Sequence, residues 1–190
     1  MATRSFLIMF IFAVVCVFVV RTLVRRFRLT ERAIRKVKAG KIAEALAMLE
    51  SAMRRGGDTP ALIGTLGRIH LMDHRAAEAE AELRRAIGLG SQDYTHYNAL
   101  GWALIELDRL DEALPIAETA NKLAREDLEV YCLYCGVMAH HGRGAEVVSL
   151  FDFLKRTKAQ IAISKPKVYH SELSKKFEFA SSKMNTAGFA

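Results

Sequence analysis

The chain of 190 residues contains little of what builds loops, disulfides or β-sheets. It has 3 prolines, 12 glycines and 3 cysteines. So few prolines and glycines exclude a collagen-like chain and argue against a disordered one. Valine, isoleucine and threonine form no alternating runs after residue 24, which argues against strands. The composition therefore predicts an all-α protein.

The sequence also lacks the short motifs of common enzyme classes. It contains no G-x-G-x-x-G, Walker, G-x-S-x-G or H-E-x-x-H pattern, so nothing in it predicts nucleotide or hydrolase chemistry. His70 and His74 are spaced to share a helix face, but no third metal ligand lies near them in the sequence. We therefore expect a protein that is not an enzyme, with no cofactor, no metal site and no small-molecule substrate.

The cysteines are too few and too scattered for a disulfide framework, and Cys16 lies inside an apolar run. Free thiols fit a reducing compartment. Cys132 and Cys135 form a C-x-x-C within a helical pattern, with no second pair to complete a zinc site. Two interpretations stay open: a pair of buried helix thiols, which we favour, and a redox or metal-binding pair.

The net charge of +7 is unevenly distributed along the chain. Residues 1–41 carry ten bases and one acid, residues 42–154 carry ten bases and eighteen acids, and residues 155–190 carry eight bases and two acids. The acidic middle lacks the basic stripe expected of a nucleic-acid-binding domain, so we predict no nucleic-acid partner. The basic ends instead suit anionic lipid head groups.

An apolar run lies close to the N-terminus. No charged residue occurs from Ser5 to Val20, and an extension to Val24 gives a helix of about 30 Å, enough to cross the hydrocarbon core of a membrane. A cleaved signal peptide is the alternative, but the run ends at Arg21 without a small-residue cleavage site. The pattern therefore predicts an uncleaved transmembrane anchor.

The bases around this run predict its orientation. Only Arg4 precedes it, whereas nine bases follow between Arg21 and Lys41. The positive-inside rule then places the rest of the chain in the cytoplasm. We expect a single-pass protein of the cell inner membrane, which contacts the membrane through residues 5–24 and anionic lipid through the basic residues that follow.

Similar residues recur every 34 positions through most of the chain. A fixed period of this length is typical of stacked helical repeats, in which each unit packs only on its neighbours. The recurring sets are Ala45, Ala79, Ala113 and Val147; Ala52, Ala86, Ala120 and Leu154; Glu44, Glu78, Glu112 and Glu146; Lys41, Arg75, Arg109 and Arg143; Leu66, Leu100 and Tyr134; and Gly67, Gly101 and Cys135.

Each unit is predicted to contain two helices joined by a short turn. The small residues of the repeat let the two helix axes approach closely, and the larger apolar residues fill the space around them. The first helices are expected at Leu62 to Met72, Tyr94 to Leu107 and Val130 to His140, and the second helices at Ala76 to Ile87, Asp111 to Leu123 and Ala145 to Arg156.

These residues resemble the pattern of the tetratricopeptide repeat family over residues 26–156. The resemblance is carried by Leu66-Gly67, Ala79, Leu83 and Ala86 in one unit and by Leu100-Gly101, Ala113, Ala117 and Ala120 in the next. It implies three full repeats and a degenerate first one, whose leading helix around Leu29 to Lys38 joins the apolar helix. The departures from the family pattern are Gly57, Ser91 and Arg125 in place of the usual proline, and Cys135, Val147 and Leu154 in place of small residues.

The resemblance implies a right-handed superhelix whose first helices line a concave groove for a peptide or helix of another protein. Trp102 is the only tryptophan; it either anchors a partner or packs between neighbouring first helices, and both roles stay open. The residues expected in the groove are Thr65, Arg68 and Met72; Asn98, Trp102, Ile105 and Glu106; and Cys132, Gly136 and His140.

Beyond the repeats, residues 157–190 form a basic tail. Pro166 interrupts the chain, and an apolar stripe at helical spacing follows it. The tail either caps the last repeat or docks on a membrane or a partner as a basic, aromatic segment. The residues of the stripe are Val168, Tyr169, Leu173 and Phe177, with Lys175 and Lys176 opposite.

Together these observations predict three regions and one function. Residues 1–25 are expected to form the transmembrane anchor, residues 26–156 the repeat solenoid and residues 157–190 the tail. The predicted function is a non-catalytic, membrane-anchored scaffold that recruits or assembles partner proteins, for example in envelope biogenesis. The alternatives are an accessory structural subunit of a membrane complex and an organelle-surface receptor for targeting sequences.

Overall fold

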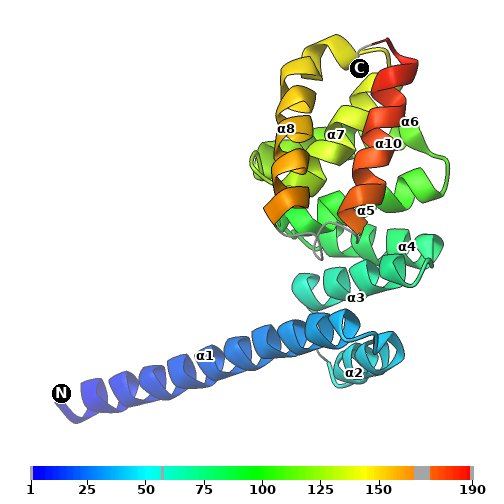
Figure 1. The fold of residues 1–190 in the computed structure, drawn as a ribbon. Coiled ribbons are helices and arrows are strands. Elements are labelled where there is room, and N and C mark those ends of the chain that lie inside the picture. The colour runs from blue at the N-terminus through cyan, green and yellow to red at the C-terminus, as the bar shows by residue number, and fades with distance from the viewer. Residues whose placement is uncertain (1, 57, 165–171, 189–190) are drawn as a thin grey trace.

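The computed structural model describes residues 2–56, 58–164 and 172–188, and every regular element in these residues is a helix. The helices stack in chain order into a solenoid (Figure 1). The elements are α1 (Ala2–Lys38), α2 (Ile42–Arg54), α3 (Pro60–Met72), α4 (Ala76–Gly88), α5 (Tyr94–Glu106), α6 (Leu110–Leu123), α7 (Leu128–His140), the 3-10 helix η1 (Gly144–Val147), α8 (Val148–Ser164) and α10 (Glu172–Thr186).

The solenoid consists of helix pairs that follow the 34-residue period. The pairs are α1 with α2, α3 with α4, α5 with α6, and α7 with η1 and α8. Small residues lie between paired helices: a Cβ added at Gly67 would come within 2.8 Å of the Leu83 side chain and 3.1 Å of the Ala79 carbonyl oxygen. Because that oxygen belongs to the backbone of α4, no larger side chain fits here without moving a helix.

The turn between the two helices of each pair has the same backbone conformation in all four pairs. One residue per turn adopts a positive φ, between 58° and 75°, at positions 34 residues apart. Glycine takes this left-handed conformation without strain, whereas a residue with a Cβ does not. The four residues are Gly40, His74, Asp108 and Gly142.

An ion pair closes each of these turns. Arg75 and Glu78 approach within 3.0 Å, Arg109 and Glu112 within 2.7 Å, and Lys41–Glu44 and Arg143–Glu146 repeat the pattern. Hydrogen bonds from the paired arginine lower the pKa of Glu112 and Glu146, and hydrogen bonds from Lys36 and then Lys41 lower that of Glu44. These pairs are exposed to solvent, so each one stabilises the fold only slightly. They explain why a base and an acid recur together at three-residue spacing.

His96 packs between α3 and α5. Its ring lies over Gly64, where an added Cβ would come within 2.3 Å of the ring, and its Nδ1 is 2.7 Å from the Ser91 hydroxyl. The side chain is 1% exposed, and this burial lowers the pKa of His96. The nearby carboxylate of Asp93 opposes this shift and the charge of Arg68 adds to it. Burial at this contact therefore favours the neutral form of the His96 ring.

The last pair departs from the others. Its second helix starts as the 3-10 helix η1, which contains Val147 where earlier pairs have a buried alanine. α7 packs more extensively on α10 than on α8, and Figure 1 shows α10 running alongside α7. Phe177, Ala180 and Met184 of α10 belong to the same apolar core as α5 to α8. Val168 and Tyr169, which we predicted for the apolar stripe, lie outside the described residues.

The N-terminal apolar run is not the transmembrane anchor that we predicted. None of the described helices combines the length and the apolar character that a membrane span requires. The run is the first part of the longer helix α1, which continues through a strongly basic stretch to Lys38 and packs its last turns on α2 and α3. The prediction of a transmembrane helix in residues 1–25 is therefore wrong. The inner-membrane location is tested by no described feature and stays a prediction.

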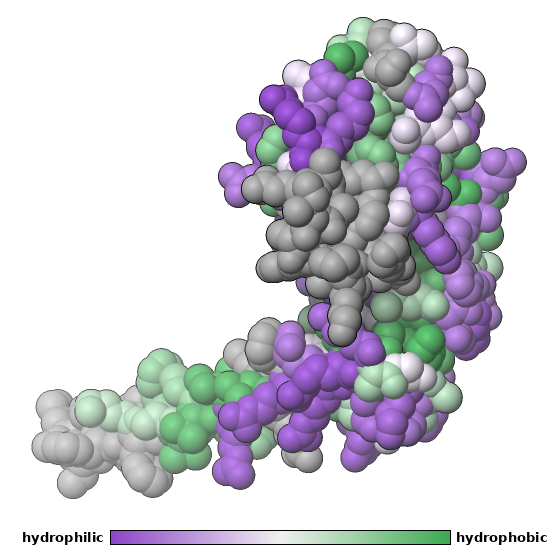
Figure 2. All heavy atoms as spheres, viewed as in Figure 1, coloured by the Kyte–Doolittle hydropathy of each residue, from purple (hydrophilic) through white to green (hydrophobic). Residues whose placement is uncertain are grey.

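α1 nevertheless exposes many large apolar side chains. Phe12 and Phe18 are each 70% exposed, and Figure 2 shows apolar side chains along the free part of this helix. Patches of this kind on a protein surface mark contacts with another molecule. The exposed large apolar residues of α1 are Met9, Ile11, Phe12, Val14, Val15, Val17, Phe18, Val19, Val20 and Val24.

The positive φ of the turns predicts opposite effects of two substitutions. His74→Gly removes the strain of a Cβ in the left-handed conformation, so we expect the free energy of unfolding to rise by about 0.5–1 kcal/mol. Gly142→Ala introduces that strain and should lower it by about 1 kcal/mol. Urea unfolding followed by circular dichroism measures both. A His74→Gly protein less stable than the unchanged chain would contradict this account.

The burial of His96 predicts a dependence of stability on pH. The unfolded chain protonates His96 near pH 6.5, whereas the folded chain resists protonation, so stability is lost as pH falls below that value. The loss from one group is at most about 1.4 kcal/mol per pH unit. His96→Gln keeps a polar side chain for Ser91 but does not titrate. We expect the free energy of unfolding of this variant, measured with urea, to fall less between about pH 7.5 and 5.5 than that of the unchanged chain. His74→Gln, a substitution on the surface, is the control and should leave the dependence on pH unchanged.

Candidate functional site

Three residues from successive first helices define one surface, which we call the first-helix face. Arg68 on α3, Trp102 on α5 and Gly136 on α7 lie 34 residues apart and so occupy the same place in each pair. Arg68 is half-buried, whereas Trp102 and Gly136 are buried. All three were predicted to line the groove, and the structure shows what covers two of them.

The cover is the C-terminal helix α10. The Phe179 ring lies directly on the α7 backbone, because a Cβ added at Gly136 would come within 2.3 Å of the ring. The same ring meets Trp102 edge to face, with 5.4 Å between the ring centroids and 72° between the planes. Such edge-to-face pairs stabilise a contact beyond the area that they bury. α10 therefore contacts first helices of two successive pairs.

A lysine of α10 adds charged contacts to this surface. Lys176 Nζ lies 2.6 Å from the Glu129 carboxylate at the start of α7, and 5.5 Å from the centroid of the Trp102 ring. The Lys176 side chain is only 16% exposed, so water screens this ion pair less than the pairs at the turns. A cation over an indole ring is a further attraction. Lys176 and Phe179 thus hold α10 on the first-helix face.

Two polar atoms on α5 have no hydrogen-bond partner in the described part of the chain. They are Asn98 Oδ1, an acceptor, and Trp102 Nε1, a donor. Each side chain is 8% exposed, and the two residues are one helical turn apart. Leaving such a group buried without a partner costs about 1–3 kcal/mol. Unsatisfied polar atoms of this kind are uncommon in folded proteins and indicate a missing partner.

The remaining predicted groove residues differ in exposure. Met72 and Glu106 end α3 and α5 and are exposed, and Ile105 is half-buried beside them. His140 ends α7 and is exposed; partial desolvation and the nearby charge of Lys183 on α10 lower its pKa. These residues therefore remain accessible at the ends of the first helices, beside the part that α10 covers.

Thr65 and the two cysteines of α7 do not offer groups to a ligand. Thr65 is 4% exposed, and its hydroxyl donates to the Ala61 carbonyl oxygen of its own helix at 2.7 Å. Cys132 and Cys135 are buried, and burial raises the pKa of Cys135 to about 12, far from that of a reactive thiolate. Within the described residues, no group of three or more His, Cys, Asp or Glu side chains is placed to hold a metal ion.

Sequence reasoning missed the two residues of α10 that make most of the contact, Lys176 and Phe179. Lys176 was placed opposite the apolar stripe, and Phe179 was not singled out. One signal pointed to them: Gly136 has no side chain at the position where Arg68 and Trp102 stand in the other units. A gap at a recurring surface position indicates that another segment fills it.

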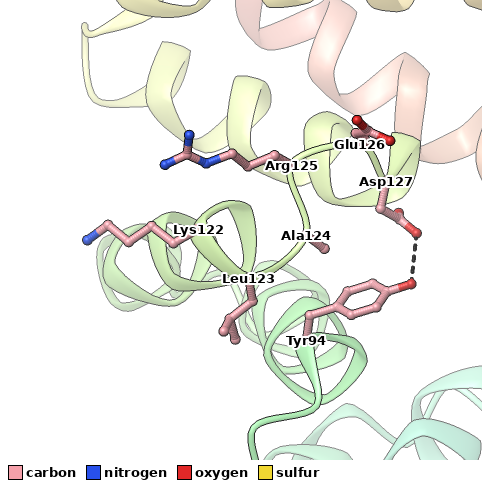
Figure 3. A pocket seen from close by; sticks show the side chains of 7 residues that line it. All are labelled: Tyr94, Lys122, Leu123, Ala124, Arg125, Glu126 and Asp127. Carbon is pink, nitrogen blue, oxygen red and sulfur yellow. Dashed lines mark hydrogen bonds between the residues drawn. The ribbon is translucent and has the colours of Figure 1, made fainter.

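A hollow lies away from the first-helix face, where α6 meets α7 (Figure 3). Its volume is about 610 Å³, and the Tyr94 hydroxyl donates to Asp127 at its edge over 3.1 Å. Lys122 and Arg125 extend away from this pair. The chain leaves α6 at Ala124 with an extended φ of −142°, whereas Gly56 and Gly90 have positive φ at the equivalent positions. The charges around the hollow are mixed and do not converge on one point.

Comparison with known proteins agrees with this architecture. Residues 36–101 match the family model described as tetratricopeptide repeat. No curated protein matches the chain. Solved structures are similar in fold: YrrB, a tetratricopeptide-repeat protein with an unusual peptide-binding site, shares 17% identity at a TM-score of 0.59, with 83% of this chain and 85% of YrrB covered.

Two further structures show the same fold at low identity. The first tetratricopeptide-repeat domain of human RPAP3 is 22% identical with a TM-score of 0.54, over 59% of this chain and 88% of that domain. MamA is 16% identical with a TM-score of 0.57, over 82% of this chain and 96% of MamA. The family model thus matches residues 36–101, and the solved structures share the fold over a larger part of the chain.

Proposed function

We propose that this chain is a protein-interaction scaffold whose first-helix face binds a peptide or helix of a partner protein. The fold supports this function, because tetratricopeptide repeats are typically non-catalytic interaction domains and stacked helix pairs form extended binding surfaces. YrrB, which shares the fold, has a peptide-binding site. The observation that carries the proposal is the pair of unsatisfied atoms on α5, Asn98 Oδ1 and Trp102 Nε1.

The chemistry of this pair suits a polypeptide. A peptide backbone presents N–H donors and C=O acceptors, so it can donate to Asn98 and accept from Trp102. Hydrogen bonds to both atoms remove the free-energy cost of leaving them buried without partners. The pair therefore favours recognition of a partner main chain.

Arg68 provides a charge for the same partner. It is half-buried on α3, and none of the described residues forms an ion pair with it. Its positive charge contributes to lowering the pKa of His96 at the start of α5, which places it beside that helix. A guanidinium in this position binds a carboxylate with two parallel hydrogen bonds. We expect the partner to present an acidic side chain to Arg68.

A second candidate function is that of a fixed subunit in a larger assembly, and the exposed apolar side chains of α1 favour it. Ten large apolar residues between Met9 and Val24 are at least 42% exposed. A surface of this size on one helix is stabilised when another protein covers it. In this case the repeats would hold a neighbouring subunit while α1 packs in the assembly.

Reversing the charge of Arg68 tests the scaffold function. We expect Arg68→Glu to lower the amount of partner captured on the tagged full-length protein by about tenfold, because the partner's acid then meets a like charge. Quantitative mass spectrometry of the captured proteins gives the ratio. Lys122→Glu is the matched control, since it makes the same charge change at the hollow between α6 and α7. Equal losses for both variants, or a loss for Lys122→Glu alone, would refute binding at the first-helix face.

The stoichiometry of captured proteins separates the two candidate functions. A fixed subunit retains the same neighbours in whole-number ratio, and two substitutions on α1, Phe12→Ser and Phe18→Ser, should release them by removing apolar contacts. A scaffold retains partners below equal ratio, and these partners should be lost with Arg68→Glu but not with the α1 variant. The copy number of each captured protein, measured against the tagged chain, distinguishes these outcomes.

A further inference from the structure

The first-helix face already holds a helix, and that helix belongs to the same chain. Phe179 of α10 lies on Gly136 and against Trp102, and Lys176 pairs with Glu129. Lys176 is near the start of α7, and Lys183, seven residues later, is near His140 at its end. α10 therefore runs parallel to α7 along its length. The contacts show which kind of ligand this face accepts: a helix with a base and an aromatic ring three residues apart.

α10 is an incomplete ligand for this face. With α10 in place, Asn98 Oδ1 and Trp102 Nε1 remain without partners in the described residues, and Arg68 forms no ion pair with any of them. The acidic residue of α10 nearest to this contact, Glu178, is exposed and bonds to Ser174 of its own helix. A helix that also satisfies these groups gains interactions that α10 does not make.

The remaining contacts of α10 resist its removal. Phe177 stacks on Phe151 with 5.8 Å between the ring centroids, and Ala180 and Met184 are fully buried. α10 also has the advantage of being tethered, which gives it a high effective concentration at the face. A partner must therefore compete with it, and the apparent affinity falls by the fraction of molecules in which the face is open.

We propose that α10 is an intramolecular occupant of the first-helix face, and that the partner is an amphipathic helix that displaces it. The partner carries a base for Glu129, an aromatic ring for Gly136 and Trp102, and an acid for Arg68. This inference rests on the scaffold function proposed above. It adds the chemistry of the partner and the means by which binding is regulated: the face is closed until a helix with the additional acid arrives.

Two double variants of the full-length protein test this competition. The release variant, Lys176→Glu with Phe179→Ala, removes the ion pair and the ring from the face. The control, Lys175→Glu with Phe153→Ala, makes the same chemical changes at an exposed position of α10 and at a Phe that is 46% exposed on α8. Circular dichroism checks that both variants keep their helices. The probe is a fluorescent synthetic peptide with the sequence of residues 172–188.

We expect the release variant to bind this peptide about tenfold more tightly than the unchanged chain and the control, because its face is open in most molecules. Adding Gly136→Leu to the release variant should abolish the gain, since the leucine occupies the place of the Phe179 ring. Equal peptide affinity in the release variant and the unchanged chain would overturn the inference. So would a gain that survives Gly136→Leu, because the peptide would then bind elsewhere.

Trp102 reports directly on the position of α10, since it is the only tryptophan. Acrylamide quenching of its fluorescence should increase about twofold or more in the release variant, as a buried ring becomes open to solvent, and stay unchanged in the control. Unchanged quenching in the release variant would mean that Lys176 and Phe179 do not hold α10 on the face, which overturns the inference. Light scattering must also show that the unchanged chain is monomeric. If the unchanged chain forms dimers and the release variant does not, the α10 that occupies the face belongs to a second copy of the chain.

The failure of this inference can be told apart from the failure of the scaffold function. If Arg68→Glu abolishes partner capture and the release variant captures no more partner than the unchanged chain, the face binds partners but α10 does not compete. If the release variant binds the peptide tightly and Arg68→Glu does not change the amount of partner captured, the face binds only its own helix. That second result refutes the scaffold function and, with it, displacement by a partner.

Discussion

The close approach of the two helices in each pair is the constraint on which the rest of the structure depends. Gly67 brings α3 so close to α4 that only the Leu83 side chain and the Ala79 backbone fit against it. The turns adopt a left-handed residue and a base–acid pair every 34 residues, in step with this packing. The period also aligns Arg68, Trp102 and Gly136 on one face. The residues that permit packing thus also determine which side chains a partner meets.

The place of α10 follows from the pair in which this constraint is relaxed. Val147, Phe151 and Leu154 are buried in the last pair, and the first of them lies in a 3-10 turn where earlier pairs begin an α-helix. Large residues here cannot bring α8 as close to α7 as Ala79 and Ala86 bring α4 to α3. α7 therefore has apolar surface left to cover, and α10 covers it with Phe177 and Ala180. Gly136 lets α10 approach the backbone of α7 closely, as Gly67 does between α3 and α4.

Features that recur could be predicted from the sequence, and features that occur once could not. The helix pairs, the turns and the Arg–Glu pairs repeat, so each column of residues carries the same physical requirement several times. The contact between Lys176 and Glu129 spans 47 residues and does not recur at the 34-residue period among the described residues, so no column of the repeat predicts it. Hydropathy made residues 1–25 look like a membrane anchor, whereas none of the described helices has the length and apolar character of a span. The sequence also does not show that the Thr65 hydroxyl donates to a carbonyl oxygen of its own helix.

Trp102 shows why packing and recognition cannot be separated on this surface. It is 8% exposed and part of the apolar core, yet its ring contacts Phe179 and Lys176 of the occupant, and its Nε1 atom has no partner in the described residues. A residue with both roles links binding to the order of the last pair, because anything that replaces α10 must also rebuild the cover over Trp102. A partner therefore succeeds only if it offers an aromatic ring and the polar groups that α10 lacks. Selectivity then depends on the difference between two helices that compete for one face, rather than on the total strength of either.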